Sequence, residues 1–105
     1  ELFRLLSRDI GRAALLAGDW TADQRVAAFL VGMSRRLAAR GFSASCFQLT
    51  MARTDIANYL RLAPETISRV LRRMQDDGLV AVERRDVSLL DRDRIEALAA
   101  PILRE

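Results

Sequence analysis

The chain of 105 residues contains no histidine and no lysine, and it has a single cysteine and two prolines. Without histidine the sequence lacks the commonest general base and metal ligand. Cys46 has no second cysteine or histidine with which to form a disulfide or share a metal ion. The sequence also contains no nucleophile elbow, phosphate loop or recognisable carboxylate pair from which to build a catalytic site. We therefore expect a chain that is not an enzyme and that holds no metal ion and no cofactor.

Long apolar runs are also missing, although 50% of the residues are hydrophobic. No transmembrane helix and no secretory signal peptide is predicted, so we expect a protein of the cytoplasm. The length predicts one domain with a modest core. The chain begins with Glu1 and not with Met, from which we expect a part of a longer protein.

All basic residues are arginines, and they are unevenly placed. Residues 50–75 carry five arginines against two carboxylates, whereas residues 76–105 carry five against eight. Such an asymmetry orients a protein on a polyanion. Arginine in place of lysine suits forked contacts with phosphate, although codon usage is the plainer explanation.

Residues 50–78 predict two helices joined by a tight turn at 61–63. We expect Thr50 to cap the first helix, Pro64 to occupy the first position of the second, and Gly78 to end it. The second helix has an apolar stripe at helical spacing, made of Ile67, Val70, Leu71 and Met74.

The opposite face of this second helix is polar and suits a helix lying in the major groove of DNA. Its outward residues are Glu65, Thr66, Ser68, Arg69, Arg72 and Arg73. Two packed helices without a ligand remain the alternative.

The flanking segments complete a domain. Residues 2–17 predict a helix that stops at 18–19, and a second helix is expected over 23–40, opened by a capping box of Thr21 and Gln24 and closed by Gly41. Trp20 is expected to pack back onto that helix. Residues 47–49 predict a short strand.

After Gly78 the spacing of the apolar residues is no longer helical. Residues 79–82 and 87–90 predict two strands joined by a polar tip at 83–86. A helix-turn-helix followed by such a hairpin is a winged helix. Arg84 and Arg85 at the tip can reach a phosphate, but the carboxylates of Glu83 and Asp86 flank them. A tip that makes no contact with DNA is therefore an equal alternative. We expect Asp91 to cap a last helix and Pro101 to help end it.

The segment FQLTMARTDIANYLRLAPETISRVLRRMQDDGLVAVERRDVSLLDRDRIEALA resembles the DNA-binding domain of the CRP/FNR family of bacterial transcription regulators, in its FNR branch. The resemblance covers residues 21–100. It implies a mainly α fold with a small β-hairpin wing, that is, a winged helix-turn-helix over 19–105, preceded at 1–18 by the end of a dimerisation or linker helix. It also implies that the sensory ligand or cofactor belongs to a domain before residue 1.

The implied partners are double-stranded DNA, RNA polymerase in the full-length protein, and a second copy of that protein, in the bacterial cytoplasm; the isolated chain can be a monomer. The recognition-helix signature Glu-x-x-Ser-Arg stands here as Glu65, Ser68 and Arg69. The resemblance implies that these three residues touch the bases of a half-site like TTGAT. Their chemistry agrees, because a carboxylate accepts from the cytosine amino group and a guanidinium grips guanine.

The resemblance gives phosphate contacts to Arg53 and Thr66, and we expect one of Arg72 and Arg73 to meet the DNA backbone as well. Ala63 stands where many relatives place a capping serine or threonine. A second hypothesis from another class is a winged-helix module whose outward face binds a protein.

Overall fold

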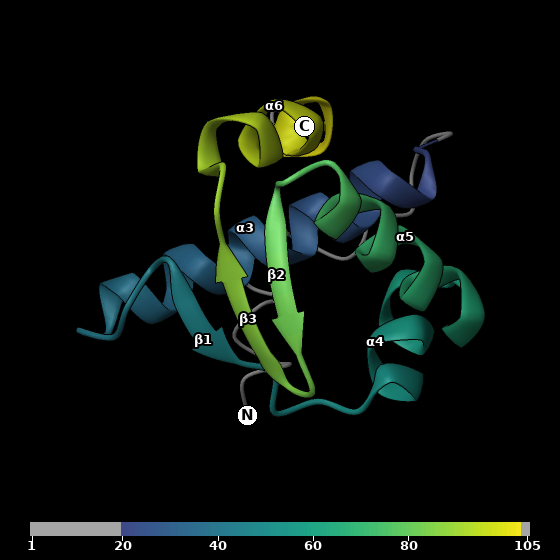
Figure 1. The fold of residues 1–105 in the computed structure, drawn as a ribbon, viewed down its shortest axis with the longest axis horizontal. Coiled ribbons are helices and arrows are strands. Elements are labelled where there is room, and N and C mark those ends of the chain that lie inside the picture. The colour runs from purple at the N-terminus through teal and green to yellow at the C-terminus, as the bar shows by residue number, and fades with distance from the viewer. Residues whose placement is uncertain (1–19, 104–105) are drawn as a thin grey trace.

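The computed structural model describes residues 20–103, which form four helices and three strands (Figure 1). In chain order these are α3 (Ala22–Ala39), β1 (Cys46–Gln48), α4 (Arg53–Leu60), α5 (Pro64–Asp76), β2 (Val80–Glu83), β3 (Asp86–Leu89) and α6 (Arg92–Leu103). The helix predicted over 2–17 and the predicted boundary between residues 18 and 19 lie outside the described residues. The mainly α winged helix-turn-helix that we predicted is confirmed.

Helix α3 is the central support of the fold. It begins with the predicted capping box, in which the hydroxyl of Thr21 accepts from the backbone N–H of Gln24 at 3.1 Å and the Gln24 side chain accepts from Thr21 N–H at 2.9 Å. Residues 26–34 are all buried, more than a one-sided stripe predicts, because α3 contacts both α6 and α5. Trp20 packs against the same core, as expected.

The sheet has the strand order β1-β3-β2, with both pairs antiparallel. The predicted hairpin is present as β2 and β3, which we call the wing (residues 80–89). The predicted strand at 47–49 is also present, one residue earlier, but the sequence did not reveal its partner: Phe47 lies opposite Val87 on β3. In Figure 1 the sheet stands in front of α3, with α6 above and the tip of the wing below.

Helices α4 and α5 form the helix-turn-helix. The buried residues of α5 are the four predicted ones, and α4 buries a residue that the sequence analysis missed: Tyr59, whose ring lies 6.2 Å from that of Phe29. The expected cap at Thr50 is wrong. Helix α4 begins after Ala52, and a hydroxyl two residues before that position is too early to serve the N–H groups of the first turn.

Helix α6 differs from expectation at its end. Asp91 caps it as predicted, accepting from the N–H of Arg94 at 3.2 Å. Pro101, however, lies inside the helix, which continues to Leu103. The burial of Ile102 in the core holds this last turn in place, although proline removes one backbone hydrogen bond.

Gly78 should be sensitive to a side chain even though open space surrounds it. Its φ is 74°, and a Cβ in this region meets its own backbone. We expect Gly78→Ala to lower the free energy of unfolding by about 1 kcal/mol in urea denaturation, and Gly78→Asn to lower it less because asparagine visits this region. Equal stability of all three proteins would contradict this reading of the helix end.

Candidate nucleic-acid interface

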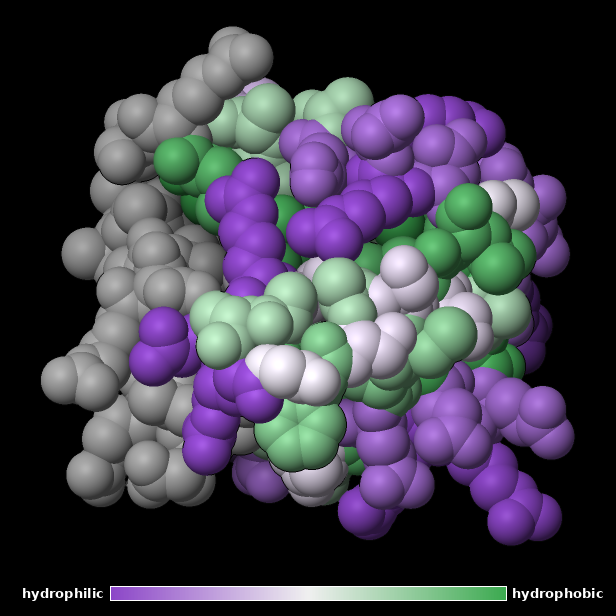
Figure 2. Space-filling view, turned by 90° about the vertical axis from the view of Figure 1, so that its left-hand side faces the viewer, coloured by the Kyte–Doolittle hydropathy of each residue, from purple (hydrophilic) through white to green (hydrophobic). Residues whose placement is uncertain are grey.

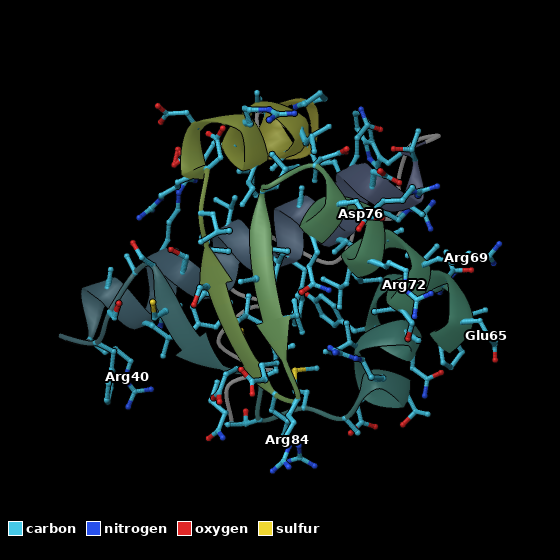
Figure 3. All side chains as sticks on the ribbon, in the orientation of Figure 1. Arg40, Glu65, Arg69, Arg72, Asp76 and Arg84 are labelled. Atoms are coloured by element: carbon cyan, nitrogen blue, oxygen red, sulfur yellow. The ribbon has the colours of Figure 1, made fainter. Side chains whose placement is uncertain are left out.

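Helix α5 presents one polar face to solvent, because its apolar stripe is turned into the core. The side chains of Glu65, Ser68 and Arg69 are exposed, and with Arg72 they line a shallow hollow of about 300 Å³. Figure 3 shows Glu65 and Arg69 pointing outward from the side of the molecule that α5 occupies. The structure thus brings together the three predicted base-reading residues and one predicted phosphate ligand on a single surface.

The start of α5 is set by backbone geometry and by proline. Pro64 is the first helical residue, as predicted, and Ala63 before it is extended, with φ −72° and ψ 146°. No side chain caps this helix, since Ala63 offers only its carbonyl, which accepts from Thr66 N–H at 3.0 Å. Glu65 therefore stands in the first turn, where a negative charge is favoured by the helix dipole.

The other helical residues predicted to bind phosphate differ in their surroundings. Arg53 and Thr66, both half-buried, lie in the first turns of α4 and α5. Arg73 instead forms an ion pair with Asp23 in the first turn of α3. The phosphate roles of all three stay predictions, and for Arg73 the structure adds a competing partner within the protein.

The wing reaches outward from the same domain and ends in two arginines. Arg84 and Arg85 are both exposed, and Arg84 has a left-handed φ of 59°. The wing is tied to α5 by Gln75, whose side-chain oxygen accepts from the N–H of Val82 at 2.9 Å. Sequence patterns offered no signal for this contact, because an exposed glutamine on a helix has many possible partners. Figure 3 places Arg84 at the far tip of the hairpin.

A second contact that the sequence analysis missed joins α3 to the helix-turn-helix. The guanidinium of Arg25 donates to the carbonyl of Leu60, the last residue of α4, at 3.2 Å. This bond satisfies a carbonyl at the helix C-terminus, where cations are favoured. The orientation of α4 is thereby coupled to the start of α3.

The side of the molecule away from α5 has a different character. Figure 2 shows green and white residues interleaved with purple ones on that side. Two large apolar side chains are exposed in the described part of the chain, Phe42 at 63% and Leu90 at 60%. Within residues 20–103 no helix is long and apolar enough to cross a membrane, and no group of three or more potential ligands is placed to hold a metal ion.

The chain is similar to known proteins with a helix-turn-helix domain. The family described as the Crp-like helix-turn-helix domain matches residues 24–98. The chain is 49% identical over 102 residues to the transcriptional activator protein anr of Pseudomonas aeruginosa, covering 94% of this chain and 42% of that protein. It is 44% identical over 102 residues to the fumarate and nitrate reduction regulatory protein of Salmonella typhimurium, covering 94% of this chain and 41% of that protein.

Among solved structures, the chain is similar to FixK2 from Bradyrhizobium japonicum, with a TM-score of 0.70 and 41% identity over 80% of this chain and 41% of that one. The chain therefore spans about two fifths of the length of these proteins.

The uncapped start of α5 yields a stability prediction. We expect Ala63→Thr to raise the free energy of unfolding by about 1 kcal/mol, because the hydroxyl can accept from an N–H of the first turn. Ala63→Val has nearly the same shape without the acceptor and serves as the control. A gain for both variants, or for neither, in urea denaturation would show that a missing cap does not limit the stability of this helix.

Proposed function

Because the chain belongs to the Crp-like helix-turn-helix family, we propose that it is the DNA-binding part of a transcription regulator and that α5 is its recognition helix. The observation that carries this proposal is the outer face of α5. Glu65, Ser68 and Arg69 stand exposed within the first half of that helix, while the apolar stripe behind them is buried. A helix presented in this way can enter the major groove with its N-terminal residues on base edges.

The charge along α5 supports entry by its N-terminal half. Arg69 and Arg72 are exposed in the middle of the helix, whereas Asp76 and Asp77 are exposed at its C-terminal end and cap. Figure 3 shows Asp76 set back along the helix from Glu65. Phosphates are attracted to the arginines and repelled by the two carboxylates, which favours an approach that keeps the C-terminal end of α5 away from the DNA backbone.

In the proposed complex, Glu65 accepts a hydrogen bond from a cytosine amino group, Arg69 donates two to a guanine, and Ser68 contacts a neighbouring base. The half-site is TTGAT-like. Arg53, Thr66 and Arg72 hold phosphates on either side, and the wing arginines reach the backbone further out. These phosphate contacts fix orientation, while the base contacts carry the sequence preference.

The full-length protein binds as a dimer to a palindrome whose half-sites lie about one helical turn apart. RNA polymerase is its further partner, a proposal supported by relatives named transcriptional activators. The site of action is the bacterial cytoplasm. The stimulus belongs to a part of the protein outside this chain.

Arg69→Ala tests the base-reading assignment. In gel shifts with a dimeric form of the chain and a palindrome of two TTGAT-type half-sites, the variant should lose about 1–3 kcal/mol of discrimination per half-site against a scrambled duplex. Arg40→Ala removes the same charge at the opposite end of the molecule (Figure 3) and should leave the preference intact.

Undiminished binding by Arg69→Ala would sink the assignment of Arg69, and an unchanged preference for the palindrome would remove this residue as a specificity determinant.

Salt dependence separates DNA binding from a protein-interaction module. Each phosphate neutralised by a cationic side chain adds about −0.9 to the slope of log K against log salt concentration. With Arg53, Arg72 and one wing arginine engaged, we expect a slope of roughly −3 per chain on both palindromic and scrambled duplexes. A flat response would mean that these arginines do not meet DNA and would favour the protein-binding alternative.

A further inference from the structure

Three helices of this domain end in the same way, but with different residues. After α3 and α5 the chain turns back through Gly41 and Gly78, with φ of 87° and 74°. In each case the N–H groups of that glycine and of the next residue bind carbonyls of the last turn. Helix α4 ends with the same pair of bonds, from Arg61 N–H to Asn58 at 3.3 Å and from Leu62 N–H to Ala57 at 2.9 Å. Here the left-handed residue is Arg61, with φ 56°.

Arginine at this position is strained in a way that glycine is not. A Cβ in the left-handed region crowds the adjacent carbonyl, which is why helices usually end this way with glycine. The side chain of Arg61 is exposed, and within residues 20–103 it makes no hydrogen bond or ion pair. The two backbone hydrogen bonds of the turn support its conformation, but no polar contact of the Arg61 side chain within residues 20–103 offsets the strain. Strain of this kind points to a function for the side chain.

The position of Arg61 indicates which ligand its side chain binds. Arg61 comes three residues before Pro64, where α5 begins, and it follows Leu60, whose carbonyl is held by Arg25 from α3. Among the described residues outside glycine, positive φ values occur at two places, Arg61 and Arg84, and both are exposed arginines. One lies in the turn before α5 and the other at the tip of the wing. A guanidinium so placed suits phosphate, which it can bind through two parallel hydrogen bonds.

We propose that Arg61 binds a backbone phosphate of the DNA beside the bases that α5 reads, and that this contact is the function of the exposed left-handed arginine. The proposal rests on the proposed function. Arg61 acts as a positioning contact that holds the register of α5 on the duplex and adds affinity for any sequence. Neutralising this side chain should therefore weaken binding uniformly, without changing which sequence is preferred.

The test exploits opposite expected effects on folding and on binding. Arg61→Gly and Arg61→Asn remove the charge with residues that tolerate a left-handed φ, whereas Arg61→Lys keeps both charge and strain. Arg40→Asn, at the far end of the molecule (Figure 3), controls for net charge. Affinity of the whole 105-residue chain for labelled palindromic and scrambled duplexes is measured by fluorescence anisotropy over a salt series, and Tm by circular dichroism.

Arg61→Gly and Arg61→Asn should bind both duplexes roughly fivefold to tenfold more weakly at about 0.1 M salt, with a salt slope shallower by about 1. Arg61→Lys should weaken binding less than the two neutral variants do, because it keeps the charge but loses the two parallel hydrogen bonds of the guanidinium. The Tm of Arg61→Gly should equal or exceed that of the wild type, because glycine relieves the strain.

Three results would overturn the proposal: wild-type affinity in the two neutral variants, an equal loss in Arg61→Lys or Arg40→Asn, or a lower Tm for Arg61→Gly. If the wild type prefers the palindrome and the neutral variants bind with wild-type affinity, the proposed role of Arg61 is wrong but the proposed function is supported. If the wild type binds no duplex, both fall.

Discussion

The burial of one apolar stripe on α5 decides which side chains this domain shows to the outside. Ile67, Val70 and Met74 are almost fully buried, so the helix cannot rotate about its axis without exposing them. Burying such side chains contributes about 1.5–3 kcal/mol each. Glu65 and Arg69 are consequently held on the outer face. The packing of α5 on the core therefore sets the orientation of the surface that we propose reads DNA.

The ends of α5 are held by separate contacts that give the helix a defined position. Pro64 begins it, and Gly78 ends it with a left-handed turn. Along its length Arg73 pairs with Asp23 of α3, and Gln75 holds β2. The outer face of α5, the first turn of α3 and the wing are therefore linked by contacts of α5.

Periodicity and helix-end chemistry predicted most of the fold. Three features depend only on residues that are close together in the sequence, so one sequence is enough to predict them. They are the apolar stripe of α5, the capping box at Thr21 and the cap at Asp91. What could not be predicted depends on distant partners. The pairing of β1 with β3 and the burial of Tyr59 arise from tertiary packing, which local patterns do not encode. Pro101 was misread because the burial of Ile102 outweighs the lost hydrogen bond.

The candidate site was predictable to a similar extent. The residue types on the outer face of α5 and their spacing follow from the sequence, and the structure gathers Glu65, Ser68 and Arg69 as expected. The internal partner of Arg73 was not predictable, because Asp23 lies fifty residues away along the chain. Nor was the backbone conformation of Arg61, since arginine is not a residue that signals a left-handed turn.

The central claim is that the outer face of α5, the turn before it and the tip of the wing meet DNA. Titration of the isotope-labelled chain with a palindromic duplex, followed by NMR chemical shifts, tests it directly. The account predicts that the largest shifts cluster at residues 61–72 and 84–85, with little change around the exposed apolar side chains of Phe42 and Leu90. Shifts centred on Phe42 and Leu90, with residues 61–72 unaffected, would contradict it.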